Sequence, residues 1–267
     1  MTTAWFAILV VAALGLLFGV VDALQRRGRM GAEAGRKTVH IGMGFIGVLL
    51  PWFFRSPGPV WLLCALAAAF LGSVRMVPAV GRRLGKVLGG VERTTYGDMF
   101  YPLGVAAAFT LSGEKAAFCA AVGTLAFGDT AGAIVGPRWG RLRYAFLGCR
   151  KSLEGSCAVL LTCAVWTGCA MAFLGGASLP SAAAGAVLVS TAAALIEAAS
   201  WCGLDNLLLP VAVVWLVRIW LGDGTVHRSP AIWAALGAAA LLWLTAGAAI
   251  ARAHARAEPE AGRLAPP

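Results

Sequence analysis

Apolar stretches alternate with short polar loops along almost the whole chain. Most of these stretches approach the roughly 20 mostly apolar residues that a helix needs to cross a bilayer. The pattern predicts about nine membrane-spanning helices, over residues 3–24, 40–54, 60–76, 98–112, 116–135, 153–174, 181–202, 207–221 and 231–251. We therefore expect an all-α, polytopic membrane helix bundle that forms one transmembrane domain over residues 1–251, followed by a short polar tail over residues 252–267.

The composition excludes a soluble domain. The chain is 60% hydrophobic and only 13% charged, with a mean hydropathy of +0.80, whereas a soluble domain carries about 25% charged residues. The seven cysteines form no CxxC pair, and most of them lie in apolar stretches. We interpret them as small packing residues rather than as zinc ligands or disulfide partners.

The basic residues are distributed unevenly about the predicted helices. Of the 22 lysines and arginines, 18 lie in alternate loops on one side and in the tail. The remaining four are Arg55, Lys115, Arg218 and Arg228. The positive-inside rule places the N-terminus outside and the C-terminus in the cytoplasm of a multi-pass protein of the cell membrane. Because this rule also accounts for the net charge of +10, we expect no nucleic-acid partner.

A basic motif stands at the cytoplasmic mouth of the second predicted span. Arg36 and His40 are four residues apart, so on a helix they share a face, and Lys37 lies beside them. Two cations and an imidazole suit a polyphosphate. Ordinary positive-inside flanking explains the same residues without any ligand, so both interpretations stay open.

Four acidic residues lie at the cytoplasmic ends of the later spans. Asp98 starts the fourth span, Asp129 and Glu197 lie inside the fifth and seventh spans, and Asp205 precedes the eighth. An ionised carboxylate within a membrane is costly unless it faces a cavity or a partner, which indicates a functional site. Carboxylates that converge with basic residues favour a magnesium-nucleotide site, because Mg²⁺ binds a few carboxylates together with phosphate oxygens.

A polar motif precedes the sixth span. Ser152 is placed to cap the helix, and Lys151 stands next to the free amides of its first turn. A helix N-terminus with an adjacent lysine and a small residue such as Gly155 is a good phosphate site. Simple capping, with Glu154 favourable in the first turn, explains Ser152 and Glu154 equally well.

Glycines repeat every four residues near the end of the fifth span. Gly128, Gly132, Gly136 and Gly140 would line up as one smooth stripe on a helix, which favours close contact with a second helix. Such a stripe would also leave room for a ligand beside Asp129.

The order of these motifs resembles the CTP-dependent polyprenol kinase family, which includes phytol, farnesol and dolichol kinases. The resemblance covers about residues 33–210. The motifs that carry it are, in chain order, RKxxH from Arg36, GDxxYPLG from Gly97, Gly128-Asp129 with its glycines, KSxEGS from Lys151, and Glu197 followed by Asp205-Asn206 and Pro210. One departure is Asp98, which stands where this family more often has glutamate.

The resemblance implies an enzyme that transfers the γ-phosphoryl group of CTP to a lipid alcohol with the help of a divalent metal. By position, it assigns Lys151, Ser152, Glu154 and Gly155 to the nucleotide site and Arg36, Lys37 and His40 to phosphate contacts. It assigns Asp129 to metal binding or catalysis. The chain is shorter than typical dolichol kinases, which favours a shorter isoprenoid alcohol.

These inferences combine into one hypothesis for the mechanism. Asp129, together with Glu197 or Asp205, would hold Mg²⁺, and the catalytic candidates are Asp129, Asp98 and Glu197. Either Asp129 or Asp98 would orient the alcohol or accept its proton, and that choice stays open. The site would face the cytoplasm, and the oligomeric state is left open.

Three other functions compete with this hypothesis. The segment from Asp129 to Gly155 also resembles phosphatidate cytidylyltransferases, but their histidine-rich acidic signature is missing around Glu197 to Pro210. A CTP-dependent diacylglycerol kinase is a relative of the same family. A proton- or cation-coupled transporter would use the intramembrane carboxylates differently, although the polar residues thin out toward the outer side.

Overall fold

The computed structural model describes residues 3–76, 97–146, 149–200 and 203–222. The last predicted span, residues 231–251, and the polar tail lie outside the described residues.

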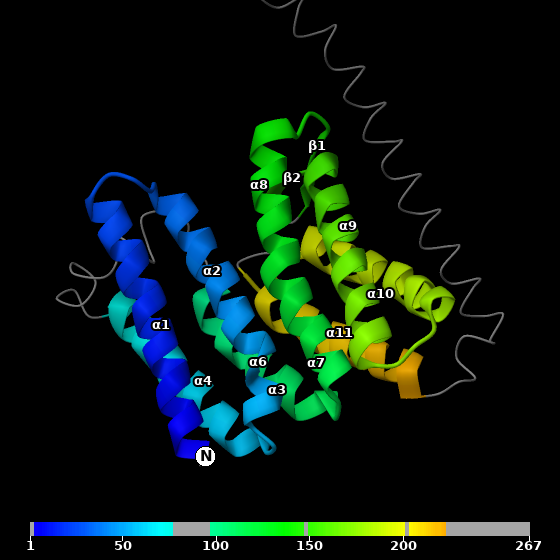
Figure 1. Cartoon of the computed structure of the whole chain (residues 1–267). Helices are drawn as coiled ribbons and strands as arrows, with labels where there is room; N and C mark the ends of the chain where they lie inside the picture. Colours follow the sequence, from blue (N-terminus) through cyan, green and yellow to red (C-terminus); the bar gives the residue numbers. More distant parts are fainter. Residues whose placement is uncertain (1–2, 77–96, 147–148, 201–202, 223–267) are drawn as a thin grey trace, which may run out of the picture.

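Helices make up most of the described chain (Figure 1). Two of the helical segments, η1 and η2, are single π-helical turns that continue a neighbouring α-helix. The elements are α1 (Thr3–Arg26), α2 (Ala32–Val48), α3 (Leu50–Phe53), α4 (Pro57–Met76), α6 (Gly97–Ser112), α7 (Lys115–Gly123), η1 (Thr124–Gly128), α8 (Asp129–Trp139), β1 (Arg143–Phe146), β2 (Cys149–Ser152), α9 (Leu153–Cys169), η2 (Ala170–Leu174), α10 (Leu179–Ala199) and α11 (Asp205–Gly222).

The expected membrane helix bundle is confirmed in outline. Six described segments are long and apolar enough to cross a bilayer, namely Thr3–Arg26, Pro57–Val74, Lys115–Trp139, Leu153–Leu174, Leu179–Ala199 and Asp205–Gly222. The fourth predicted span corresponds to the shorter helix α6. The expectation of nine spans stays a prediction, because α2 and α6 are not among these six segments and the ninth predicted span lies outside the described residues.

The second predicted span differs most from its helix. Residues 40–54 were expected, whereas α2 begins eight residues earlier, at Ala32, and ends at Val48. The charged residues at its start resemble a loop in a hydropathy pattern, yet they continue the helix, and Lys37 among them contacts the helix that carries Asp129. Arg36, Lys37 and His40 therefore lie within a helix rather than at its mouth.

The all-α bundle is confirmed, and one short hairpin adds to it. Residues 143–146 and 149–152 form an antiparallel hairpin, in which Tyr144 pairs with Lys151 and Arg143 with Ser152. Tyr144 and Phe146 stand two residues apart in the first strand, and such a period of two is typical of strands. The segment is short and polar, so the hydropathy pattern alone identifies it as a loop. The hairpin matters because β2 carries Lys151 directly into the start of α9.

The helix formed by α7, η1 and α8 is the centre of the bundle. Every residue from Ala116 to Gly123 is buried. Trp166 of α9 lies flat against this helix, and a side chain at Gly123 would overlap its indole ring. The Trp166 indole N–H donates a hydrogen bond to the Cys119 carbonyl over 2.7 Å. The smallest residues of α7 thus let a large aromatic residue of α9 approach its backbone.

The predicted glycine stripe packs one helix against another. A β-carbon at Gly128 would lie 2.6 Å from Cys163 Sγ, and one at Gly132 would lie 2.7 Å from Val159 Cγ2. A β-carbon at Gly136 would lie 3.2 Å from Ser152 Oγ and 3.9 Å from the Gly155 α-carbon. The stripe therefore brings α8 and α9 together, as the packing interpretation predicted.

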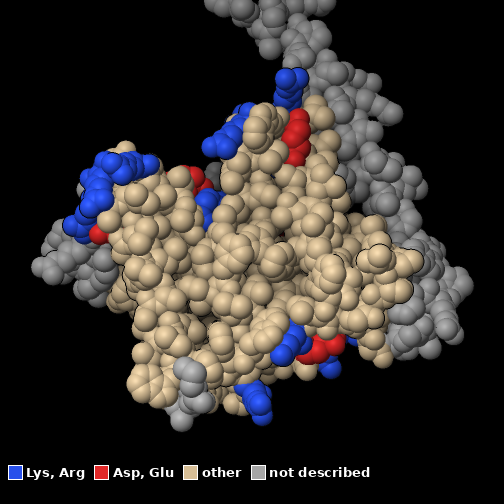
Figure 2. Space-filling model, viewed as in Figure 1, with Lys and Arg blue, Asp and Glu red and all other residues tan. Residues whose placement is uncertain are grey.

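Charged side chains gather at the two ends of the bundle, with an uncharged band between them (Figure 2). The end that we call the basic end holds the C-terminal end of α1, the start of α2, the end of α8 and the hairpin (Figures 1 and 2). A notch separates α1 and α2 from α8 and the hairpin at this end, and Lys and Arg stand on both of its rims (Figure 2). The opposite end carries Arg55, Lys115 and Arg218.

Candidate active site

An ion pair joins α2 to the central helix. Lys37 Nζ donates to Asp129 Oδ2 over 2.7 Å, and only 9% of the Lys37 side chain is exposed. The Asp129 side chain keeps 26% of its surface exposed. A lysine that is nearly buried in a membrane bundle needs such a carboxylate partner, since burial of an unpaired charge is costly. The pair fixes Asp129 and leaves part of it accessible.

His40, one turn after Lys37 on α2, approaches the same carboxylate. Its Nε2 is 3.6 Å from Asp129 Oδ2 and 3.2 Å from the Leu125 carbonyl oxygen. The ring of Tyr101, from α6, packs edge-on against the imidazole with 4.9 Å between centroids. His40 thus links α2, α6 and the central helix, and it faces the same carboxylate oxygen as Lys37.

Asp129 stands directly after the π-helical turn η1. A π-helical turn inserts an extra residue into a helix, and such turns are frequent at functional sites. Thr130 Oγ1 donates to the Ala126 carbonyl, which satisfies one of the acceptors of this turn. The irregular turn sets the direction of Asp129 relative to the regular helix that follows.

The charge of Arg36 acts on the Asp129 carboxylate, but the ion pair of Arg36 is with Glu33. This ion pair, with Glu33 one turn earlier, is bidentate at 2.7 and 3.0 Å, and both side chains are exposed. Of the predicted phosphate-binding motif, Lys37 is buried, His40 is half-buried and Arg36 is exposed. The Arg36 side chain is 43% exposed.

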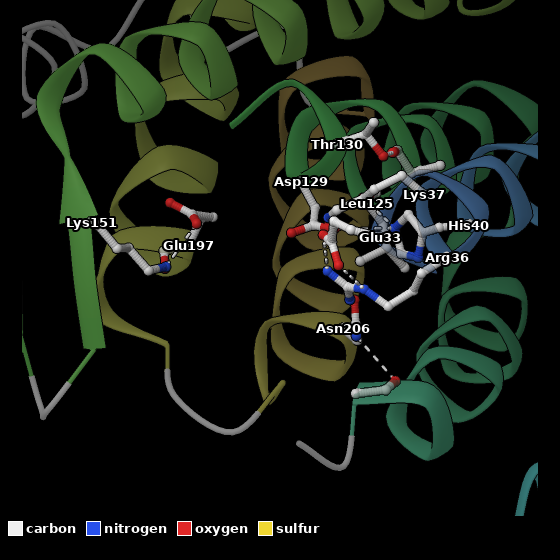
Figure 3. Close-up of polar contacts among 12 residues, drawn as sticks. Glu33, Arg36, Lys37, His40, Leu125, Asp129, Thr130, Lys151, Glu197 and Asn206 are labelled. Carbon is white, nitrogen blue, oxygen red and sulfur yellow. Dashed lines mark hydrogen bonds and ion pairs between the residues drawn. The ribbon is translucent and has the colours of Figure 1, made fainter. Parts of the chain in front are cut away.

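A second ion pair joins the hairpin to α10. Lys151 Nζ donates to Glu197 Oε1 over 2.7 Å and also contacts the Glu197 carbonyl oxygen. The side chains are 19% and 14% exposed. Figure 3 shows this pair across from the group around Asp129, with α11 behind and between them. Two cation-carboxylate pairs therefore face one region near the basic end.

The start of α9 has the geometry of a capped helix N-terminus. The Ser152 side chain accepts a hydrogen bond from the Gly155 amide over 3.2 Å. Glu154 turns back and accepts from the amides of Arg141 and Leu142, at 2.9 and 3.1 Å. Glu154 thus anchors the segment between α8 and the hairpin, so its contacts within the described residues are structural. Gly155 allows α9 to approach Gly136 of α8.

Asp205, the first residue of α11, lies within electrostatic range of both ion pairs. The charges of Asp129, Lys151 and Glu197 all act on its carboxylate. Among the described residues, Asp205 Oδ1 is buried and has no hydrogen-bond partner. A buried polar atom without a partner is uncommon and indicates a ligand, an ion or a water molecule at that position.

The neighbour of Asp205 connects α11 to the fourth span. Asn206 Nδ2 donates to the Gly97 carbonyl over 3.0 Å (Figure 3). Gly104 of α6 lies so close to the Asn206 backbone that a β-carbon there would overlap it. The start of α6, which includes Asp98, is therefore held beside the Asp129 and Asp205 region.

The predicted carboxylates suit a magnesium site only in part. Within the described residues, no group of three or more His, Cys, Asp or Glu side chains is arranged to hold a metal ion. Magnesium bound to a nucleotide needs only one or two carboxylates, because phosphate oxygens and water complete its octahedron. The unpartnered Asp205 oxygen fits such a ligand, whereas Asp129 and Glu197 each already hold a lysine.

Two tyrosines complete the site: Tyr101 belongs to the GDxxYPLG motif, whereas the sequence alone did not identify Tyr144 as part of the site. Tyr144 of β1 shares a 2.6 Å hydrogen bond with Ser156 of α9. Burial raises the pKa of the Tyr144 phenol, and the negative charge of Glu197 adds to the effect. Tyr101 is 5% exposed. Tyrosine is common at membrane interfaces, so position in the sequence could not reveal these contacts.

The fold and this site together define a multi-pass membrane protein with paired cations and carboxylates near one end of its bundle. A curated phytol kinase from Synechocystis sp. (strain ATCC 27184 / PCC 6803 / Kazusa) is 33% identical over 231 residues, which cover 82% of this chain and 94% of that relative. The chain belongs to the polyprenol kinase family of phytol kinase-like proteins, as its ordered motifs predicted. No family model and no solved structure matches it.

Proposed function

We propose that this protein is a CTP-dependent kinase that phosphorylates an isoprenoid alcohol of the phytol class. The observation that carries the proposal is the 33% identity to a phytol kinase along 82% of the chain. The site supports it, because two ion pairs, a capped helix N-terminus and an unpartnered carboxylate oxygen lie near one end of the bundle. Preference for CTP rests on the family resemblance.

In this proposal, Lys151 and the positive end of the α9 helix dipole attract the terminal phosphates of the nucleotide. Their positive charge balances the charge that develops as the phosphoryl group moves. Arg36 at the rim contacts the phosphates from the opposite side. Magnesium, held by Asp205 with Glu197 or Asp129, would neutralise charge on the phosphate oxygens.

Asp129 then orients the alcohol. Lys37 and His40 both contact its Oδ2, which leaves Oδ1 to accept the hydrogen of the substrate hydroxyl. The hydroxyl oxygen forms a bond to the γ-phosphorus, the bond from that phosphorus to its bridging oxygen breaks, and CDP leaves. The hydroxyl proton passes to a carboxylate. Asp98 at the start of α6 stays a second candidate for this role.

The orientation in the membrane is part of the proposal. The basic end faces the cytoplasm, where nucleotides are found, and the N-terminus lies outside. We further propose nine spans, with the last over residues 231–251.

The proposal is tested with purified protein, magnesium and CTP labelled at the γ-phosphate. Phytol, farnesol, geranylgeraniol, a short dolichol, diacylglycerol and phosphatidate are offered separately. Label that enters phytyl or another isoprenyl monophosphate supports the proposal and identifies the alcohol. Label that enters only phosphatidic acid overturns the proposal in favour of a diacylglycerol kinase. Label that leaves as pyrophosphate only when phosphatidate is present overturns it in favour of a cytidylyltransferase.

A further inference from the structure

An apolar groove opens on the membrane-facing side beside the candidate site. It has a volume of about 500 Å³ and lies between α2 and α9, with η1 as its floor. Its lining residues are Phe45, Phe127, Leu161, Thr162, Val165 and Trp166. Three of them are aromatic. Phe127 lies 5.0 Å from Phe45 and 4.7 Å from Trp166, measured between ring centroids, so the rings form one continuous wall.

The groove begins at the level of Asp129. Gly132 faces Val159 and Gly128 faces Cys163, which shows that α8 and α9 are antiparallel and in direct contact. By this register Thr162 lies about level with Asp129. From Leu161 to Trp166, α9 descends about 7 Å toward the middle of the membrane, at 1.5 Å per residue.

The α2 side of the groove is continuous with the site in the same way. Asp129 contacts Lys37 of α2, and Phe127 contacts Phe45 of the same helix. Phe45 follows His40 by five residues, which is about 7 Å along the helix axis. If the hydroxyl group of an alcohol lies at Asp129, the first carbons of its chain therefore lie in the groove.

The wall of the groove is rigid. The Trp166 indole is held by its hydrogen bond to the Cys119 carbonyl and by the space that Gly123 leaves open. The α9 rim of the groove is accessible from the bilayer, because Val165 and Leu161 are 69% and 63% exposed. A fixed aromatic wall beside an open lateral entrance suits a hydrocarbon chain that slides in from the membrane.

We propose that this groove binds the isoprenoid chain of the substrate next to its hydroxyl group, and that Val165 and Phe45 control its entry. The inference rests on the proposed function and names the subsite for the lipid part of the substrate. Figure 2 shows that the charged notch stands directly above an uncharged surface, so polar and apolar parts of one molecule have separate places to bind.

A second groove provides a matched comparison. It has a volume of about 640 Å³, lies between α1 and α4, and includes Ile8 and Leu62 in its lining. It reaches Thr3, at the end of the bundle opposite the site. Leu62 is 62% exposed, much like Val165. This groove is larger, yet it lacks continuity with Asp129, so ordinary membrane lipid is its expected occupant.

The test fills each groove with an indole in the full-length protein. Val165→Trp should raise the KM for phytol by about tenfold or more, because several methylene groups lose their contacts, while the KM for CTP changes less than about twofold. Leu62→Trp should leave both constants unchanged. If the two variants behave alike while wild-type protein phosphorylates phytol, the groove assignment fails and the proposed function stands. If wild-type protein phosphorylates no alcohol, the proposed function itself fails.

A binding measurement keeps the test independent of turnover and of folding in the variant. An isoprenoid alcohol with a diazirine near its hydroxyl end is photolysed with wild-type protein, and the labelled peptide is identified by mass spectrometry. Labelling within residues 161–166 that excess phytol removes supports the assignment. Labelling that phytol does not remove indicates ordinary membrane lipid in the groove and overturns the assignment.

Discussion

Lys37 donates to Asp129 over 2.7 Å, although 92 residues separate them in the chain. The pair ties α2 to the central helix at the point where η1 becomes α8. Its lysine is nearly buried and its carboxylate is partly accessible. The same contact therefore has two roles, one in folding and one in setting the geometry of the site.

Variants of this pair separate the two roles. Lys37→Met should destabilise the protein by about 3 kcal/mol, because it leaves a partly buried carboxylate without its counter-charge. The double variant Lys37→Gln with Asp129→Asn keeps a hydrogen bond without charges and should recover most of that stability. Its turnover should still fall on the order of 10²-fold or more, since the carboxylate is lost. Thermal unfolding and γ-phosphoryl transfer are measured on both. Near wild-type turnover of a folded double variant would contradict the proposed role of Asp129.

Lys151 should act on the nucleotide more than on the lipid. Lys151→Met is expected to raise the KM for CTP by about tenfold, because one charge-assisted contact to phosphate is lost, and to change the KM for the alcohol little. Lys115→Met, at the opposite end of the bundle, is the matched control and should change neither. Initial rates are measured over both substrate concentrations. An equal effect on the two KM values would indicate a structural role for Lys151.

The sequence predicted most of the bundle because apolar runs and caps are local features. The predicted span over residues 153–174 coincides with α9 and η2, since Ser152 caps its start. The start of α2 and the hairpin were missed because charged and short segments resemble loops. The partner of each lysine could not be predicted. Lys37 and Lys151 both looked like free phosphate ligands, and only tertiary packing brings each to a carboxylate.

Asp205 offers a prediction in which activity and stability change in opposite directions. Its buried Oδ1 has no partner among the described residues, and two other carboxylates act on it. Asp205→Asn removes that repulsion and should raise the thermal stability of the protein without metal. It should also lower turnover and raise the magnesium concentration needed for half-maximal activity. Magnesium titrations and thermal unfolding test both effects. Reduced activity with an unchanged magnesium requirement would exclude Asp205 as a metal ligand.

The glycine stripe should tolerate no added methyl group. Gly132→Ala places a β-carbon 2.7 Å from Val159 Cγ2, so one of the two helices must shift. We expect a loss of about 1–3 kcal/mol, as for other overpacked cores. Val159→Ala in the same chain should recover part of it. Gly15→Ala on α1 is the control, because nothing lies within 4 Å of that position. Unfolding midpoints in detergent compare the variants, and a neutral Gly132→Ala would contradict the close packing of α8 and α9.

The proposed orientation can be measured at the two ends of one helix. The segment Lys115–Trp139 crosses the membrane as a single helical unit, with Lys115 at one end and Arg141 just beyond the other, and both are exposed. In intact cells, a membrane-impermeant maleimide should label Lys115→Cys. Arg141→Cys should react only after the membrane is permeabilised, because the basic end faces the cytoplasm. The unsubstituted protein gives the background from the native cysteines. The reverse pattern would place the candidate site outside, away from cytoplasmic nucleotide, and would exclude the proposed kinase reaction in that orientation.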